Sequence, residues 1–241
     1  MPNSKIGGHY SQAYDDELQQ AVGRFLQMAK LAQQQLRDAM TAFTTADLVL
    51  AKQVKQSDRQ VNNFEVDIDE HCLDILARRQ PAATDLRLVL AILKSVNDIE
   101  RIGDMAKRIA KAVLRAVPDS RPSAAQLDTL NQMGQEVLQM FERAVSAFEQ
   151  MDAKAALAVL RDEKAIDSTY DDILQSSLAS MMQDVQQIAI SLQVSQVAKS
   201  LERVGDHSRN ICEQAIFLSK GSHAAHLTDA ELQQIVDKQR D

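Results

Sequence analysis

The sequence predicts an all-α protein, and three observations support this fold class. Glycine occurs 7 times and proline 4 times in 241 residues, far too rarely for a β-rich chain with many turns. The segments between the prolines are rich in Ala, Leu, Gln, Glu, Lys and Met, which are good helix formers. Apolar residues recur at helical spacing without sustained alternation, and one such stripe consists of Ile92, Val96, Ile99, Ile102, Ala106, Ile109 and Val113.

Turn and breaker residues divide the chain into six long helices. Residues 44–47 form a first turn with cap candidates. Pro81 ends the second helix because proline cannot continue a helix interior, and Gly221 ends the sixth. Residues 118–123, with two prolines, are the clear linker. The predicted helices cover about 10–43, 47–79, 82–117, 124–150, 152–184 and 186–220, with a short polar helix near 229–238.

Internal repetition shows how the six helices are grouped. The segment 39–47 recurs as 144–152 at an offset of 105 residues. Ile-Glu-Arg-Ile-Gly-Asp at 99–104 recurs as Leu-Glu-Arg-Val-Gly-Asp at 201–206, an offset of 102. The three missing residues are best assigned to the Arg79-Gln80-Pro81 turn. The chain is therefore predicted to form two tandem, duplicated three-helix bundles, residues 1–118 and residues 123–241, the second with a short C-terminal tail.

The composition argues against several classes of protein. The net charge of −7 gives no basic footprint for a nucleic-acid duplex, and 4% aromatic residues without Trp give no stacking platform for single strands. No apolar run approaches the roughly 20 residues of a membrane span, so no membrane insertion is predicted. Residues 1–10 lack the apolar core of an export signal, and Cys72 and Cys212 fit buried thiols in a reducing cytoplasm. Gly-x-Ser-x-Gly, Walker and dinucleotide motifs are missing from the sequence, so we do not expect an enzyme.

Two acidic pairs on the repeated motif are candidate metal ligands. Glu100 and Asp104, like Glu202 and Asp206, are four residues apart and lie on a flank of the apolar helix face. Two such carboxylates repel by roughly 0.2–0.5 kcal/mol on an exposed helix. A hard cation held by oxygen ligands would offset this repulsion.

Basic side chains are the other explanation for these acidic pairs. Arg101 and Arg203 are adjacent to the glutamates in sequence but point about 100° away on the helix. Lys107 and Arg209 are better placed.

The second helix of each half carries further acids. Glu65 and Asp69 are four residues apart, as are Asp167 and Asp171, with Asp172 beside them. Antiparallel packing would bring each pair to the motif of the third helix and form a four-carboxylate site in each bundle. A solvated acidic face is the alternative. None of the histidines has a glutamate three residues before it, so the Glu-x-x-His signature of ferritin-like di-iron enzymes is missing.

Two further features have structural and functional interpretations. Gly103 and Gly205 lie inside predicted helices, where each glycine lowers helix stability by about 1 kcal/mol relative to alanine. Either close packing of two helices or the close approach of a ligand would explain them. In the turn 80–87, Thr84 or Asp85 is expected to cap the third helix, and Arg87 to pair with an acid on the second. This turn is not repeated, so it makes the two halves different.

These motifs together resemble a known family. The segments are Ala-Arg-Arg-Gln-Pro-Ala-Ala-Thr-Asp-Leu-Arg at 77–87, Asp-Ile-Glu-Arg-Ile-Gly-Asp at 98–104, and 201–213 with its second Glu-Arg-x-Gly-Asp. They are similar to the PhoU family, the phosphate-specific transport system accessory proteins of bacteria. The resemblance covers about residues 10–220.

The resemblance implies a cytoplasmic, frequently dimeric protein that negatively regulates phosphate uptake and the phosphate-starvation (Pho regulon) response. It implies contact with two partners, the ATPase subunit of the phosphate ABC transporter and a membrane sensor histidine kinase. It also implies clusters of divalent or ferric ions on acidic motifs, which here match Glu100/Asp104 and Glu202/Asp206. The second-helix acids match less cleanly, since Asp167 aligns with Asn62 rather than Glu65.

We therefore expect a metal-binding signalling adaptor without an organic cofactor. Two alternatives stay open at this point, a carboxylate-bridged metalloenzyme and a purely structural helical scaffold.

Overall fold

The computed structural model describes residues 12–116, 121–225 and 227–238. This part of the chain contains α-helices and one 3-10 turn but no strand, which confirms the all-α prediction. The elements are α1 (Gln12–Thr45), α2 (Leu48–Arg79), α3 (Ala83–Leu114), α4 (Ala124–Glu149), α5 (Ala153–Gln183), η1 (Val185–Gln187), α6 (Ile188–Lys220) and α7 (Asp229–Asp237).

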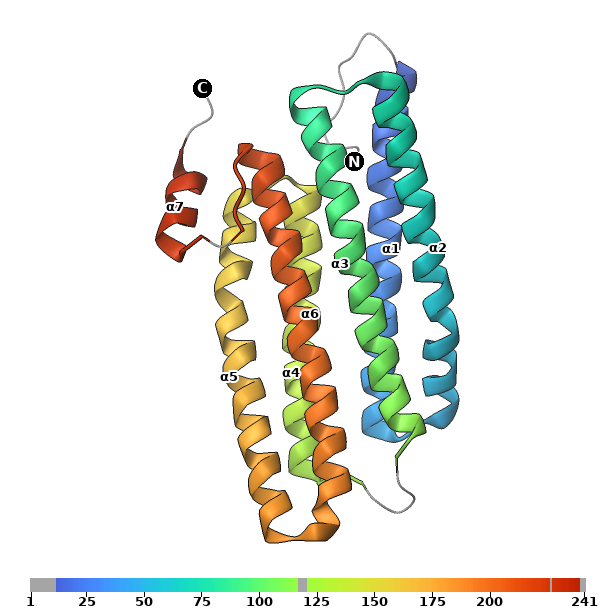
Figure 1. Cartoon of the computed structure of the whole chain (residues 1–241), viewed down its shortest axis with the longest axis vertical. Helices are drawn as coiled ribbons and strands as arrows, with labels where there is room; N and C mark the ends of the chain where they lie inside the picture. The colour runs from blue at the N-terminus through green and yellow to red at the C-terminus, as the bar shows by residue number, and fades with distance from the viewer. Residues whose placement is uncertain (1–11, 117–120, 226, 239–241) are drawn as a thin grey trace.

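The long helices form two three-helix bundles, α1–α3 and α4–α6, which lie side by side (Figure 1). Helices α3 and α6 are next to each other in the centre, and the short α7 lies outside against α5 (Figure 1). The predicted pair of duplicated bundles is thus confirmed. The boundaries at 118 and 123 stay a prediction. The predicted start at residue 10, the end of the third helix at 117 and the first part of the linker, 118–120, lie outside the described residues.

Equivalent caps start the second helix of each bundle. The Asp47 side chain accepts hydrogen bonds from the backbone N–H groups of Val49 and Leu50 at 2.8 and 2.9 Å. Asp152 accepts in the same way from Lys154 and Ala155. Each carboxylate satisfies N–H groups that have no partner inside the helix, so the repeated aspartate fixes the same helix start in both halves.

The connection between the second and third helices differs between the halves. Gln80, in the left-handed region at φ 48°, ends α2 and leads through Pro81 into α3. In the second bundle Asp184 and η1 join α5 to α6. At the offsets of the repeat Arg79 corresponds to Asp184 and Ala83 to Val185, so residues 80–82 are the ones without a counterpart.

The prediction that Thr84 or Asp85 caps α3 is wrong. The N-cap is Ala82, which makes no side-chain cap bond, so both polar residues lie inside the first turn. Asp85 instead accepts a hydrogen bond from the Tyr14 hydroxyl at 3.0 Å. Thr84 accepts one from the Arg87 guanidinium at 2.9 Å.

Apolar and polar contacts join the two bundles. The buried rings of Phe25 on α1 and Phe148 on α4 have centroids 4.6 Å apart. Between α6 and α3, His207 and the Asn210 amide contact Asp98 Oδ1 at 2.9 and 2.8 Å. The bundles therefore share a packed boundary along α1/α4 and α3/α6.

The two cysteines are buried free thiols, as predicted. Burial raises the pKa of Cys72 to about 12 and also raises the pKa of Cys212. None of the helices in the described residues combines the length and the apolar character needed to cross a membrane.

Candidate functional site

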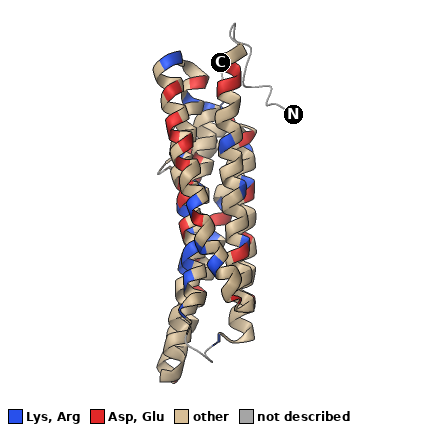
Figure 2. Ribbon diagram, turned by 90° about the vertical axis from the view of Figure 1, so that its right-hand side faces the viewer, with Lys and Arg blue, Asp and Glu red and all other residues tan. Residues whose placement is uncertain are grey.

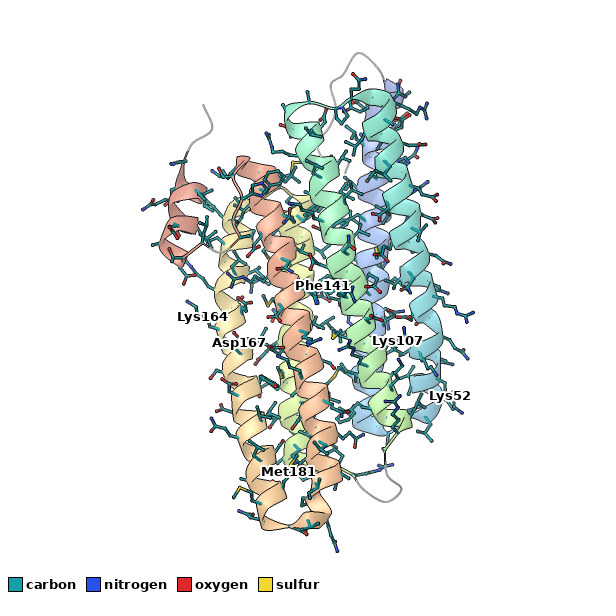
Figure 3. The ribbon with its side chains drawn as sticks, in the orientation of Figure 1. Lys52, Lys107, Phe141, Lys164, Asp167 and Met181 are labelled. Atoms are coloured by element: carbon teal, nitrogen blue, oxygen red, sulfur yellow. The ribbon has the colours of Figure 1, made fainter. Side chains whose placement is uncertain are left out.

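Three of the predicted acidic residues come together between α5 and α6. Each of Asp167, Glu202 and Asp206 offers a carboxylate oxygen, and these oxygens lie within 4.8 Å of one another. Asp167 projects from α5 toward α6 in Figure 3. The two helices run antiparallel, so an acid on α5 meets the pair that the four-residue spacing places on one face of α6.

The three carboxylates of this cluster repel one another. Asp167 and Asp206 are exposed as residues and Glu202 is half-buried. Partial burial of the carboxyl groups raises the pKa of Asp206 and of Asp167, and the neighbouring carboxylates raise both further. Glu202 Oε2 is buried without a hydrogen-bond partner, while its Oε1 accepts from Lys199 Nζ at 2.6 Å. A set of oxygen donors with one unpartnered atom suits a hard cation such as Mg²⁺, Mn²⁺ or Fe³⁺.

The other five predicted ligands do not join such a group among the described residues. Asp171 is exposed. In the first bundle burial raises the pKa of Glu100, and Asp104 and Glu65 raise it further, so these acids are near one another. Burial also raises the pKa of Asp69, whose Oδ1 is buried without a partner.

Arg101 is an exception to the expected orientation of the basic side chains. Its Nε lies 3.6 Å from Glu100 Oε2, and its Nη1 lies 4.0 Å from Asp104 Oδ2. The prediction that it points away was wrong because the long arginine side chain curls back along the helix surface.

Two acids that the sequence analysis missed hold the neighbouring cations. Lys107 Nζ lies 2.6 Å from the buried Asp58 Oδ2 and 3.3 Å from Asp104 Oδ1. In the second bundle Arg209 pairs with Glu163, which is also buried, and lies 3.2 Å from Glu213 Oε1.

The two pairs occupy equivalent positions, because Asp58 corresponds to Glu163 at the offset of 105 and Lys107 to Arg209 at 102. The two offsets of the repeat mark these residues as equivalent in the sequence, although they do not show that the two members of each pair are in contact.

The two bundles differ in sequence at the position of Asp167. Asp167 of the cluster corresponds to Asn62, whose amide Oδ1 is buried without a hydrogen-bond partner. The first bundle thus has a neutral amide where the second has a carboxylate. A lysine contacts the motif in both halves, Lys107 at Asp104 and Lys199 at Glu202, so the difference in donors comes from Asn62. The second bundle has the stronger donor set for a cation.

The glycines of the motif differ in how closely their neighbours pack. A Cβ at Gly103 would lie 3.2 Å from Gln35 Oε1 and 3.4 Å from Val61 Cγ1, closer than ordinary contacts. A Cβ at Gly205 would lie 3.5 Å from Ile166, an ordinary contact distance. Close helix packing therefore accounts for Gly103.

Replacing Lys107 with glutamine is expected to lower the free energy of unfolding by about 1–3 kcal/mol, because Asp58 is left buried without its cationic partner. The Asp58 hydrogen bond raises the pKa of Lys107, so the stabilisation is present throughout neutral pH. It is lost only as the pH rises through the raised lysine pKa in the folded state. Urea titrations at pH 7 and at alkaline pH measure this. Lys52→Gln on the outer face of α2 is the control and changes stability by less than about 0.5 kcal/mol (Figure 3).

The fold and the cluster define a class, a duplicated three-helix-bundle protein with an acidic cluster between two helices. The model of the PhoU domain matches residues 25–113 and again residues 130–215. The chain belongs to the PhoU family.

Curated relatives and solved structures support the same family. The chain is 41% identical over 219 residues to the phosphate-specific transport system accessory protein PhoU homolog of Pseudomonas putida, covering 91% of this chain and 85% of that protein. It is 36% identical to PhoU of Escherichia coli K12, covering 98% and 97%. The crystal structure of PhoU from Pseudomonas aeruginosa matches with TM-score 0.83 at 40% identity, over 87% of this chain and 100% of that chain. PhoU from Streptococcus pneumoniae, whose structure is described as that of a phosphate transport system regulatory protein, matches with TM-score 0.81 at 29% identity, over 88% and 99%.

The relatives carry names of accessory and regulatory proteins rather than enzymes, in agreement with the expectation that this chain is not an enzyme.

Proposed function

We propose that this protein is a cytoplasmic negative regulator of phosphate uptake and of the phosphate-starvation response. It acts as an adaptor by contact, binding the ATPase subunit of the phosphate ABC transporter and a sensor histidine kinase, and it works as a homodimer. The single observation that supports this role best is the match of the PhoU domain to both bundles. The names of the relatives, accessory proteins of phosphate transport, point the same way.

The adaptor holds a metal ion in the second bundle. Asp167, Glu202 and Asp206 supply the oxygen ligands, and the unpartnered Glu202 Oε2 supports this assignment. The ion offsets the repulsion among the three carboxylates and ties α5 to α6, so its role is to stabilise one arrangement of the bundle. This cluster favours the adaptor over a purely structural scaffold, which has no need of converging acids.

Deletion of the gene is expected to leave the starvation genes expressed in phosphate-rich medium, because the quiescent state of the kinase loses its stabilising partner. A transcriptional reporter measures the expression, and the unmodified gene restores repression. Normal repression in the clean deletion strain would overturn the regulatory role. Failure of the purified protein to retain either the transporter ATPase or the kinase in pull-downs would overturn the adaptor mechanism.

A further inference from the structure

A strongly basic groove lies between the C-terminal half of α3 and the N-terminal half of α6. It has a volume of about 580 Å³ and is lined by Arg108 and Lys111 from α3, by Arg115 directly after α3, and by Lys199 and Arg203 from α6. Its lining also includes the neutral polar residues Gln193, Gln196 and Ser200. Among the described residues that line it, none is Asp or Glu. Five cations thus converge on one hollow in a protein whose net charge is −7.

Most of these cations have no partner in the part of the chain that the structure describes. Lys199 lies 2.6 Å from Glu202 Oε1, but no acid of the described residues lies within 4.0 Å of the basic groups of Arg108, Lys111, Arg115 or Arg203. Like charges gathered in a hollow repel one another and concentrate the surrounding positive potential. Bringing these cations together therefore costs free energy in the empty groove. An anion bound in the groove would offset this cost.

The helix dipole does not explain why all five cations of the groove lie together. Cations in the last turn of a helix are favoured by its partial negative charge, which explains Lys111 and Arg115 near the end of α3. Lys199 and Arg203 lie in the interior of α6, where the dipole gives no such benefit. Both sets nevertheless face the same groove.

The spacing of the cations indicates the size of the ligand. Arg108 and Arg115 are seven residues apart, or about 10 Å along the helix axis at about 1.5 Å per residue. A single orthophosphate is too small to contact cations over that length. Arginine matches phosphate oxygens through paired N–H groups, and lysine adds a point charge.

We propose that the α3–α6 groove binds a small dissolved anion that carries two or more linked phosphate groups. The groove is a bounded hollow between two helices, which suits a compact ligand better than a flat charged face would. Neither the metal ion nor the protein partners of the proposed regulatory role are needed for this site. One side chain connects the groove with the three-carboxylate cluster, because Lys199 lines the groove and also donates a hydrogen bond to Glu202.

The test is calorimetric titration of the full-length protein with pyrophosphate and, separately, with inorganic phosphate. Pyrophosphate is expected to bind saturably at about 50 mM salt, at least tenfold more tightly than inorganic phosphate, because it contacts more of the cations at once. The combined variant Arg108→Gln, Lys111→Gln, Arg203→Gln is expected to weaken pyrophosphate binding at least tenfold.

A matched variant controls for charge alone. Lys52, Lys55 and Arg59 are exposed on α2, and their combined replacement by Gln removes the same number of positive charges. Figure 2 shows basic and acidic residues on several helices of the molecule. Binding of pyrophosphate by this control is expected to change less than about twofold, because exposed charges far from a site are screened. Thermal unfolding of both variants checks that each is folded.

Three results would overturn the proposal. One is no binding of pyrophosphate by the unmodified protein, and another is equal weakening in the groove variant and the α2 control. The third is binding to vesicles that contain anionic phospholipid, with none to pyrophosphate, which would assign the cations to a membrane surface instead.

Discussion

Phe148→Ala is expected to lower the free energy of unfolding by about 3–5 kcal/mol, the cost of removing a large buried aromatic side chain. Phe148 is 1% exposed, and its ring contacts that of Phe25 on the other bundle, with the centroids 4.6 Å apart. The substitution leaves a cavity at the boundary between the bundles, and the long helices around it have little freedom to close it. Urea denaturation followed by circular dichroism gives the value.

The same substitution tests whether the bundles unfold together. If the boundary between α1 and α4 couples them, Phe25→Ala and Phe148→Ala are non-additive by about 0.5–3 kcal/mol, and one cooperative transition is seen. Leu73→Ala on α2 is the control, because Leu73 is 59% exposed and its loss changes little. Two separate transitions, of which Phe148→Ala shifts only one, would contradict this coupling.

Much of the fold follows from local rules that the sequence obeys. The repeated aspartates Asp47 and Asp152 mark equivalent helix starts, and both form the caps that such residues favour. The same rules mislead at the turn before α3. There the chain enters the helix at Ala82, and Asp85 contacts Tyr14 on a different helix instead. Local preference fails at that turn because a tertiary hydrogen bond uses the carboxylate.

The sites are less predictable because they depend on which helices touch. The four-residue spacing correctly places Glu202 and Asp206 together, and antiparallel packing adds Asp167. Nothing in the spacing says that Asp58 is buried against Lys107, 49 residues away. The basic groove is similar, because its cations come from α3 and α6 and form one cluster only after the two bundles pack.

Metal-linked stability is expected to distinguish the three-carboxylate cluster from an ordinary acidic face. The variant Asp167→Asn, Glu202→Gln, Asp206→Asn is expected to be slightly more stable than the unmodified protein without metal, because the repulsion between Glu202 and Asp206, about 0.2–0.5 kcal/mol, is relieved. With a divalent or ferric ion at about 100 times its dissociation constant, the unmodified protein gains about 2.7 kcal/mol, since the ion binds only the folded state. The variant has lost its ligands and gains nothing. Urea unfolding with and without the ion, after treatment with a chelator, measures both effects.

The first bundle supplies the matched control for this experiment. Glu65→Gln, Glu100→Gln, Asp104→Asn removes three acids around the equivalent motif, where Asn62 stands in place of a carboxylate and Lys107 contacts Asp104. We expect this control to keep most of the metal-dependent stabilisation, because the stronger set of oxygen ligands lies between α5 and α6. If both variants lose the gain equally, the ion is shared between the bundles, and the assignment to the second bundle is wrong. If the unmodified protein gains no stability with any of the ions and contains no metal after gentle purification, the cluster is only an acidic face, and the acids of α5 and α6 need another explanation.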